Sequence, residues 1–251
     1  MLKYFSGQGK LFIGALDVNG NAAGLEWVGN VPSLTLTFET ETLEHKESYS
    51  GNRLVDLRLS RENRSRVNAT LEQISKENLA RLMRGTATIR TGATITNELN
   101  GPGLVAGQFI NTRFPDVTAL TITDSAGVPT TLVLNTNYRI TNARQGTIEL
   151  MNVTSFTQPL KLNYTYAGHE LVTMFTEGSN RYYCRFEGLN TADDNRPMVV
   201  ELYEVQFDPA REIALITDDV AQFELVGSAI YSSARAADAQ LGGFGRIILL
   251  T

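Results

Sequence analysis

Two runs of alternating polar and apolar side chains lie close together within residues 29–59 of this chain. In the first run, Leu34, Leu36 and Phe38 alternate with a polar set, which is Ser33, Thr35, Thr37 and Glu39. The second run begins at Leu54 and has the same period of two. This period is typical of a β-strand with one buried and one solvated face. The two runs therefore predict two half-buried strands joined as a hairpin.

The predicted connection between these strands, residues 40–53, is long and dense in charge. Hairpin loops usually have about 2–5 residues. The residues of interest in this connection are Glu41, Glu44, His45, Lys46, Glu47 and Tyr49. A long loop on a rigid sheet either makes a functional contact or is disordered. The residues alone leave both alternatives open.

Most of the remaining chain also has strand character, with one exception. Residues 75–85 predict a short helix, because Ser75 is a suitable N-cap and apolar side chains recur at helical spacing. We expect these side chains, Leu79, Leu82 and Met83, to pack the helix on the sheet. The sequence thus predicts a mainly β protein, a sandwich or barrel with one flanking helix.

The composition of the sequence changes near Asn97, where a Gly-rich stretch without periodicity follows. A self-contained series of short strands then runs to about Gly168. We therefore expect two parts. Residues 97–168 would be an inserted all-β module, Ig-like or similar, and residues 1–96 and 169–251 would form one discontinuous β domain.

Composition excludes several classes of function. The net charge is −5, whereas a protein that clamps nucleic acid needs an excess of basic residues. The single cysteine, Cys184, can form neither an internal disulfide nor a cysteine metal cluster, and we expect it to be a buried apolar residue. No apolar run approaches the ~20 residues of a membrane span, and no signal peptide is evident. The chain is predicted to be a soluble protein made in the cytosol.

Catalytic chemistry is difficult to assemble from these residues. The two histidines, His45 and His169, lack the local partners of a catalytic triad or a zinc-binding helix. We expect no enzyme activity, cofactor or metal. A carbohydrate- or receptor-binding role for the inserted module remains an alternative. Because the only tryptophan lies outside the module, its aromatic platform would rest on Tyr138, Tyr164 and Tyr166.

Four stretches carry a resemblance to a known family: VGNVPSLTLTFETETLEHKESYSG, RLVDLRLSREN, SKENLARLM and GGFGRIILL. In this order they resemble the tail tube (major tail) proteins of long-tailed bacteriophages. The resemblance covers residues 1–95 and 169–251. The segment 97–168 departs from the minimal family pattern, although inserted β modules are common in such proteins.

The resemblance implies a structural virion protein of the phage tail, made in the bacterial cytoplasm. Hexameric rings would stack into a tube that conducts the genome during ejection, with residues 40–53 as a contact between subunits or rings that becomes ordered mainly on assembly. Implied partners are further copies, the tip or baseplate, the terminator and the tape measure protein, with DNA only in non-specific transit and no membrane. The inserted module would lie outside the tube. The candidates to face the bore are Ser33, Thr35, Thr37 and Glu39. That these side chains face the solvent outside the tube is an equal alternative.

Overall fold

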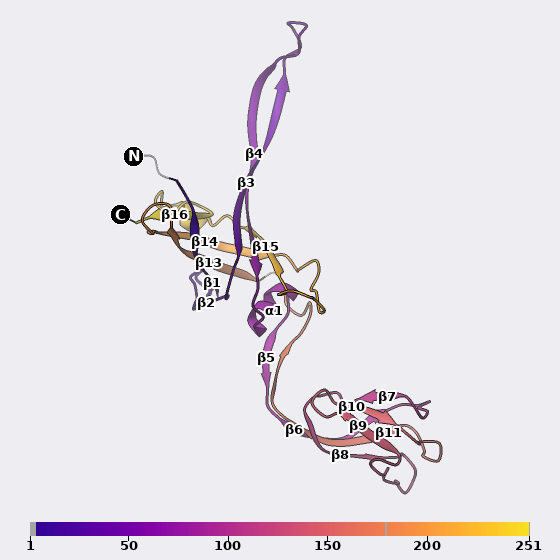
Figure 1. Cartoon of the computed structure of the whole chain (residues 1–251). Helices are drawn as coiled ribbons and strands as arrows, with labels where there is room; N and C mark the ends of the chain where they lie inside the picture. The colour runs from indigo at the N-terminus through magenta and orange to yellow at the C-terminus, as the bar shows by residue number, and fades with distance from the viewer. Residues whose placement is uncertain (1–3, 179, 251) are drawn as a thin grey trace. The chain divides into compact units, whose positions relative to one another are not determined.

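The computed structural model describes residues 4–178 and 180–250. The protein is mainly β, as predicted, and divides into two compact units (Figure 1). Unit 1 consists of Met1–Ala87 and Val172–Thr251, and unit 2 of Thr88–Leu171. Unit 2 begins before and ends after the predicted range 97–168. The difference arises because β5 (Ala87–Arg90) and β12 (His169–Val172) pair with each other as a two-stranded ribbon at this boundary.

Unit 1 is built on one eight-stranded sheet with the order β2-β1-β13-β14-β15-β4-β3, in which β16 also pairs with β14. All of these pairings are antiparallel. The strands are β1 (Gly7–Ala15), β2 (Glu26–Trp27), β3 (Ser33–Lys46), β4 (Val55–Leu71), β13 (Arg181–Asn190), β14 (Arg196–Phe207), β15 (Phe223–Ala229) and β16 (Gly245–Leu249).

The core of unit 1 draws on strands from both halves of this order. Leu11 and Ile13 of β1 belong to the same buried cluster as Leu71 of β4 and Leu225 of β15, so the sheet curls around a common interior. Alternate residues of β4 and β15 point into it, as the period of two requires. The helix α1 (Lys76–Met83) contributes Leu82 to the cluster, and a second short helix, α2 (Ser233–Ala236), has no buried residue.

Unit 2 has its own core between two three-stranded sheets, β6-β11-β8 and β7-β10-β9. Alternate residues of β11 are buried, including Leu160, Leu162 and Tyr164 on the face predicted from the sequence. Ile148 and Leu150 of β10 belong to the same cluster. The strands are β6 (Ala93–Asn100), β7 (Phe109–Asn111), β8 (Val117–Thr123), β9 (Tyr138–Asn142), β10 (Thr147–Leu150) and β11 (Leu160–Tyr166).

Two helices are described, and both are short. Among the residues that the structure covers, none lies in a helix with the length and apolar character that crossing a bilayer demands.

Candidate functional site

The hairpin formed by β3 and β4 is the most unusual element of unit 1. Its strands continue beyond the rest of the sheet as a two-stranded ribbon (Figure 1). β4 pairs with β15 only over residues 65–71, whereas it pairs with β3 along nearly its whole length. Residues 40–46 and 55–63, here called the distal hairpin, thus pair only with each other among the described strands. At about 3.3 Å per residue, nine residues of β4 extend roughly 30 Å past β15.

The structure corrects the prediction of a long loop over residues 40–53. Residues 40–46 belong to β3, β4 begins at Val55, and only residues 47–54 form the turn. Four of the predicted loop residues, Glu41, Glu44, His45 and Lys46, are therefore strand residues. The strand was missed because both faces of the distal hairpin meet solvent. No apolar alternation is needed there, so its charged sequence looked like a loop.

Most charged side chains of the distal hairpin are paired with one another. Ion pairs join Glu44 to Arg58 at 3.8 Å and Glu41 to Arg61 at 3.9 Å across the ribbon. His45 Nδ1 lies 2.7 Å from Asp56 Oδ1. Pairs as exposed as these contribute about 0–1 kcal/mol each to stability. They therefore fix the register of the two strands more than they hold the hairpin closed.

One face of the distal hairpin carries three leucines beside His45. Leu43 pairs directly with Leu59, and His45 with Leu57. Positions two apart on a strand share a face, so the three leucines form one stripe, here called the leucine stripe. Their exposed fractions are 42% for Leu43, 49% for Leu57 and 48% for Leu59. The leucine stripe thus gives an otherwise charged ribbon an exposed apolar strip.

The turn at the end of the hairpin is organised by Glu47. This side chain is 4% exposed, and its carboxylate accepts hydrogen bonds from the backbone N–H groups of Tyr49 (2.8 Å), Ser50 (2.9 Å) and Leu54 (3.2 Å). The Ser50 hydroxyl also donates to it. The Ser50 bonds first, then those from Tyr49 and Leu54, favour the carboxylate over the acid and lower the pKa of Glu47 to about 2.

This arrangement changes the role expected for Glu47. The sequence suggested a contact to a neighbouring molecule, but the carboxylate faces inward and holds the turn together. The turn thus has its own hydrogen bonds within one chain, which argues against an ordering that depends mainly on assembly. Tyr49 remains a contact candidate, since its side chain is 85% exposed at the end of the hairpin.

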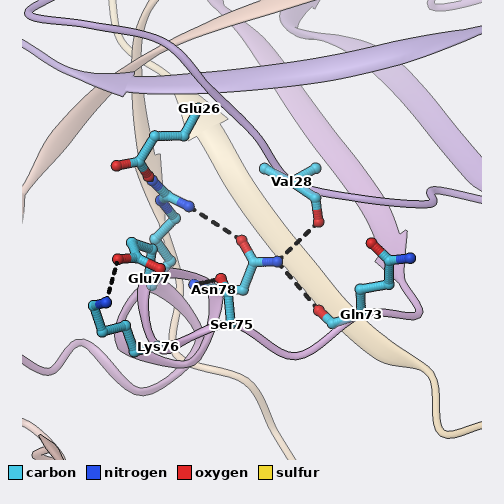
Figure 2. Close-up of polar contacts among 8 residues, drawn as sticks. Glu26, Val28, Gln73, Ser75, Lys76, Glu77 and Asn78 are labelled. Carbon is cyan, nitrogen blue, oxygen red and sulfur yellow. Dashed lines mark hydrogen bonds and ion pairs between the residues drawn. The ribbon is translucent and has the colours of Figure 1, made fainter. Parts of the chain in front are cut away.

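The other end of the hairpin is fastened by the helix α1. Ser75 caps the helix as predicted, and its Oγ accepts a hydrogen bond from the backbone N–H of Asn78 at 3.1 Å. The buried amide of Asn78 donates to the carbonyl oxygens of Val28 (2.9 Å) and Gln73 (3.2 Å), as Figure 2 shows. Asn78 therefore ties the helix to the segments that precede β3 and follow β4.

The buried face of α1 is more polar than the sequence suggested. Leu82 is 2% exposed, while Leu79 and Met83 are half-buried. Asn78 and Arg81 complete the buried face. The guanidinium of Arg81 donates to Asn78 Oδ1 at 3.1 Å and pairs with Glu26. Residues 81 and 82 lie three and four positions after residue 78, and all three therefore lie on one face of the helix. Two of them were missed from the sequence because only apolar residues were considered.

The polar residues of β3 lie on the solvated face of the sheet. Ser33, Thr35, Thr37 and Glu39 are all exposed, and the intervening Leu34 and Leu36 pack against the core cluster. The alternation was therefore predicted correctly for Leu34 and Leu36. Phe38, expected on the same face, is instead 72% exposed, because β3 extends beyond the core from this point on. Whether this solvated face lines a bore stays a prediction.

A buried ion-pair network on the neighbouring strands escaped the sequence analysis. Glu201 of β14 accepts hydrogen bonds from Arg185 of β13 (2.8 Å) and Arg246 of β16 (2.7 Å). Burial raises the pKa of Glu201, but the hydrogen bonds from Arg246 and Tyr183 and the nearby positive charges outweigh it, so the pKa is lowered. The network joins three strands whose charges, read along each strand separately, gave no sign of contact.

The remaining chemically reactive residues do not converge. Cys184 is buried, as predicted, and burial raises the pKa of its thiol to about 12. His45 lies in the distal hairpin, whereas the ring of His169 packs near Phe114 and Tyr166 in unit 2. Within residues 4–178 and 180–250 there is no cluster of three or more His, Cys, Asp or Glu side chains that could hold a metal ion. The distal hairpin is therefore the candidate functional site.

Comparison with family models gives a match over nearly the whole chain. No curated protein matches the sequence. One family model, described as Protein of unknown function UCP028589, matches residues 4–248 and so includes the distal hairpin and both units. On this match over nearly its whole length, the chain belongs to the family described as Protein of unknown function UCP028589.

Proposed function

We propose that this chain is a structural subunit that assembles with copies of itself into a tube of the kind found in the tails of long-tailed bacteriophages. The observation that carries the proposal is the distal hairpin, which leaves the sheet as a ribbon with solvent on both faces. An isolated two-stranded ribbon is only marginally stable in water. Burial of its leucine stripe against another copy supplies the missing apolar contact.

The free edge of the sheet supports self-assembly as well. β3 stands last in the strand order, so one side of this strand has no backbone partner among the described residues. An open edge strand is a template for pairing with another chain, and closing a ring of subunits removes it. Contacts that repeat from ring to ring without closing build a filament. Unit 1 offers the open edge of β3 for contacts within a ring and the leucine stripe for contacts between rings.

A tube of such subunits suits the passage of DNA. Under this proposal the solvated face of β3 lines the bore with hydroxyl groups and the Glu39 carboxylate. The subunit carries a net charge of −5, so the bore lacks the basic excess with which DNA binders displace counterions from phosphates. DNA would then pass without being held.

The alternative of carbohydrate or receptor binding by the inserted module lacks a supporting observation. Its aromatic platform would need Tyr138, Tyr164 and Tyr166 at the surface. The structure buries all three in the core of unit 2, with exposed fractions of 3%, 1% and 6%. Aromatic rings at these positions stabilise the module and leave no stacking surface for a sugar.

The proposal is tested by examining the purified protein over a wide concentration range by electron microscopy and sedimentation velocity. We expect rings or tubes that appear above a threshold concentration. Replacing the leucine stripe with serine (Leu43→Ser, Leu57→Ser, Leu59→Ser) should leave a folded monomer, as judged by circular dichroism.

A matched control replaces three exposed valines of unit 2, Val105, Val128 and Val133, with serine. This variant should assemble like the unmodified chain. Equal loss of assembly in both variants would contradict the hairpin as the specific contact. A purified chain that remains monomeric at all concentrations would overturn the proposed function.

A further inference from the structure

A hollow of about 390 Å³ opens beside α1 in unit 1. Small residues form much of its wall, including Gly14, Gly24, Ala80 and Gly85. Close contacts of the backbone require some of them. A Cβ atom at Gly85 would lie 1.6 Å from the carbonyl oxygen of Thr173, and one at Gly14 would lie 2.0 Å from that of Gly24. Gly14 and Gly85 are thus required by close backbone contacts at this hollow, here called the α1 hollow.

The α1 hollow has an excess of acidic groups. Three carboxylates line it, those of Glu26, Glu77 and Glu177, against one guanidinium, that of Arg81. Glu26 is paired with Arg81, and Glu77 with Lys76 at 3.5 Å. Glu177 accepts a hydrogen bond from the Thr86 hydroxyl at 3.0 Å, but no cation pairs with it among the described residues. The hollow therefore favours a positively charged occupant.

The turn of the distal hairpin has the opposite charge. Along the strands, acidic and basic side chains neutralise each other in pairs. Arg53 in the turn and Lys46, the last residue of β3 before it, are exposed, and neither has an acidic partner in the described part of the chain. Glu47 is nearby, but its carboxylate faces the backbone of the turn. The turn thus presents two cations and the exposed ring of Tyr49.

The turn lies at one end of the β3–β4 hairpin, and α1, beside which the hollow opens, lies near the other end (Figure 1). β4 runs for 17 residues from the turn to Leu71, and α1 follows from Lys76. A strand of this length spans about 55 Å. Two different surfaces at opposite ends of one subunit can meet head to tail in successive copies, and such a contact extends into a filament without closing.

We propose that the turn of one copy docks in the α1 hollow of the next, with Arg53 facing Glu177 and Tyr49 against the small-residue wall. This inference rests on the proposed function and identifies which surface receives the distal hairpin. The second copy is the occupant because the charges of turn and hollow are complementary and their positions favour repetition. The hydrogen bonds of Glu47 fix the turn before docking, which reduces the conformational entropy lost on binding.

Charge exchange tests this contact. Arg53→Glu and Glu177→Lys should each raise the threshold concentration for assembly at least tenfold. The double variant Arg53→Glu/Glu177→Lys should return to within about threefold of the unmodified chain, because the pair is restored with its polarity reversed. Arg53→Lys keeps the charge and Arg211→Glu reverses an exposed charge elsewhere in unit 1, and both controls should assemble normally. Sedimentation velocity gives the threshold, and thermal unfolding verifies that each variant is folded.

A proximity measurement makes the result independent of the strength of assembly. A chain with Asn52→Cys in the turn and Ala80→Cys in the hollow should form a ladder of disulfide-linked oligomers on mild oxidation. Each single variant should yield dimers at most. A control chain with Asn52→Cys and Ser33→Cys should form no ladder. Cys184 is buried and its thiol pKa is raised to about 12, so it should not interfere.

The outcomes separate this inference from the proposed function. Tubes that form with no disulfide ladder, or with an unchanged threshold for Arg53→Glu, overturn the docking of the turn in the α1 hollow and leave tube formation intact. Failure of the double variant to recover, with both single variants impaired, also contradicts the pairing of Arg53 with Glu177. An unmodified chain that never assembles overturns both proposals.

Discussion

The two halves of the β3–β4 hairpin share the same strands but have opposite surroundings. In the proximal half, Val67 and Ala69 of β4 are 3% and 1% exposed, since β15 pairs alongside and the core lies beneath. In the distal half, Leu59 of the same strand is 48% exposed. Antiparallel pairing continues through both halves. The contrast shows that strand pairing determines the shape of the hairpin, while a third strand and a core provide its stability.

The largest expected difference between the halves concerns leucine truncation. Leu71 is fully buried at the proximal end of β4, so Leu71→Ala should lower the free energy of unfolding by about 2–5 kcal/mol through lost burial and a cavity. Leu59→Ala removes the same atoms from the distal half and should change it by less than about 0.5 kcal/mol in the monomer. Urea denaturation of the two variants below the assembly threshold measures both values. Similar losses for Leu59→Ala and Leu71→Ala would show that the distal half folds with the core.

A smaller difference is expected for two asparagines, Asn78 in α1 at the base of the hairpin and Asn63 midway along β4. Asn78→Ala removes a buried amide that donates to Val28 and Gln73 and accepts from Arg81, and should cost about 1–3 kcal/mol. Asn63 accepts a hydrogen bond from Thr40 at 2.9 Å at the exposed surface, so Asn63→Ala should be nearly neutral. Thermal and urea unfolding give the comparison. A neutral Asn78→Ala would mean that α1 is not needed to hold the base of the hairpin.

The sequence was most informative where one face of an element is buried. The alternation of Leu34 and Leu36 with polar residues predicted both the strand and its orientation, and the alternation in β11 predicted the core of unit 2. Residues 40–46, the β3 strand of the distal hairpin, could not be predicted in this way. Burial imposes the period of two, and residues 40–46 have no buried face. Their strand conformation depends on pairing with residues 55–63, which follow the turn in the sequence.

The sequence and the structure draw attention to the same segment but differ in its detail. Residues 40–53, selected from the sequence for their length and charge, lie in the distal hairpin and its turn. The inward orientation of Glu47 depends on the N–H directions in the turn, which the residue types do not give. Arg81 and Glu26 meet across 55 positions of the chain. Ion pairs between residues so far apart in the sequence depend on the fold, and the same is true of the network around Glu201.

Glu47 gives a pH-dependent contrast between the turn and the core. Its pKa is about 2 in the folded turn, below the ordinary value of 4.5. A lowered pKa contributes stability that is fully present above about pH 4.5 and is lost as the pH falls toward 2. Amide chemical shifts of Tyr49, Ser50 and Leu54 should therefore change over this range while the signals of β15 remain constant. Glu47→Gln should produce the altered turn at neutral pH. Turn signals that do not change between pH 5 and 2 would contradict the role of the carboxylate.

The smallest effect is expected for the acidic residues on the strands of the distal hairpin. Glu41 and Glu44 form exposed pairs with Arg61 and Arg58 at 3.9 and 3.8 Å, so Glu41→Ala/Glu44→Ala should cost the monomer less than about 1 kcal/mol, and less still in high salt. If these glutamates were themselves the contact between copies, as the sequence suggested, their loss would prevent assembly. If the leucine stripe and the turn make the contact, the double variant should assemble at nearly the normal threshold while Glu47→Gln is impaired. Sedimentation velocity of the two variants side by side, at low and high salt, distinguishes a contact through the strand charges from one through the apolar face and the turn.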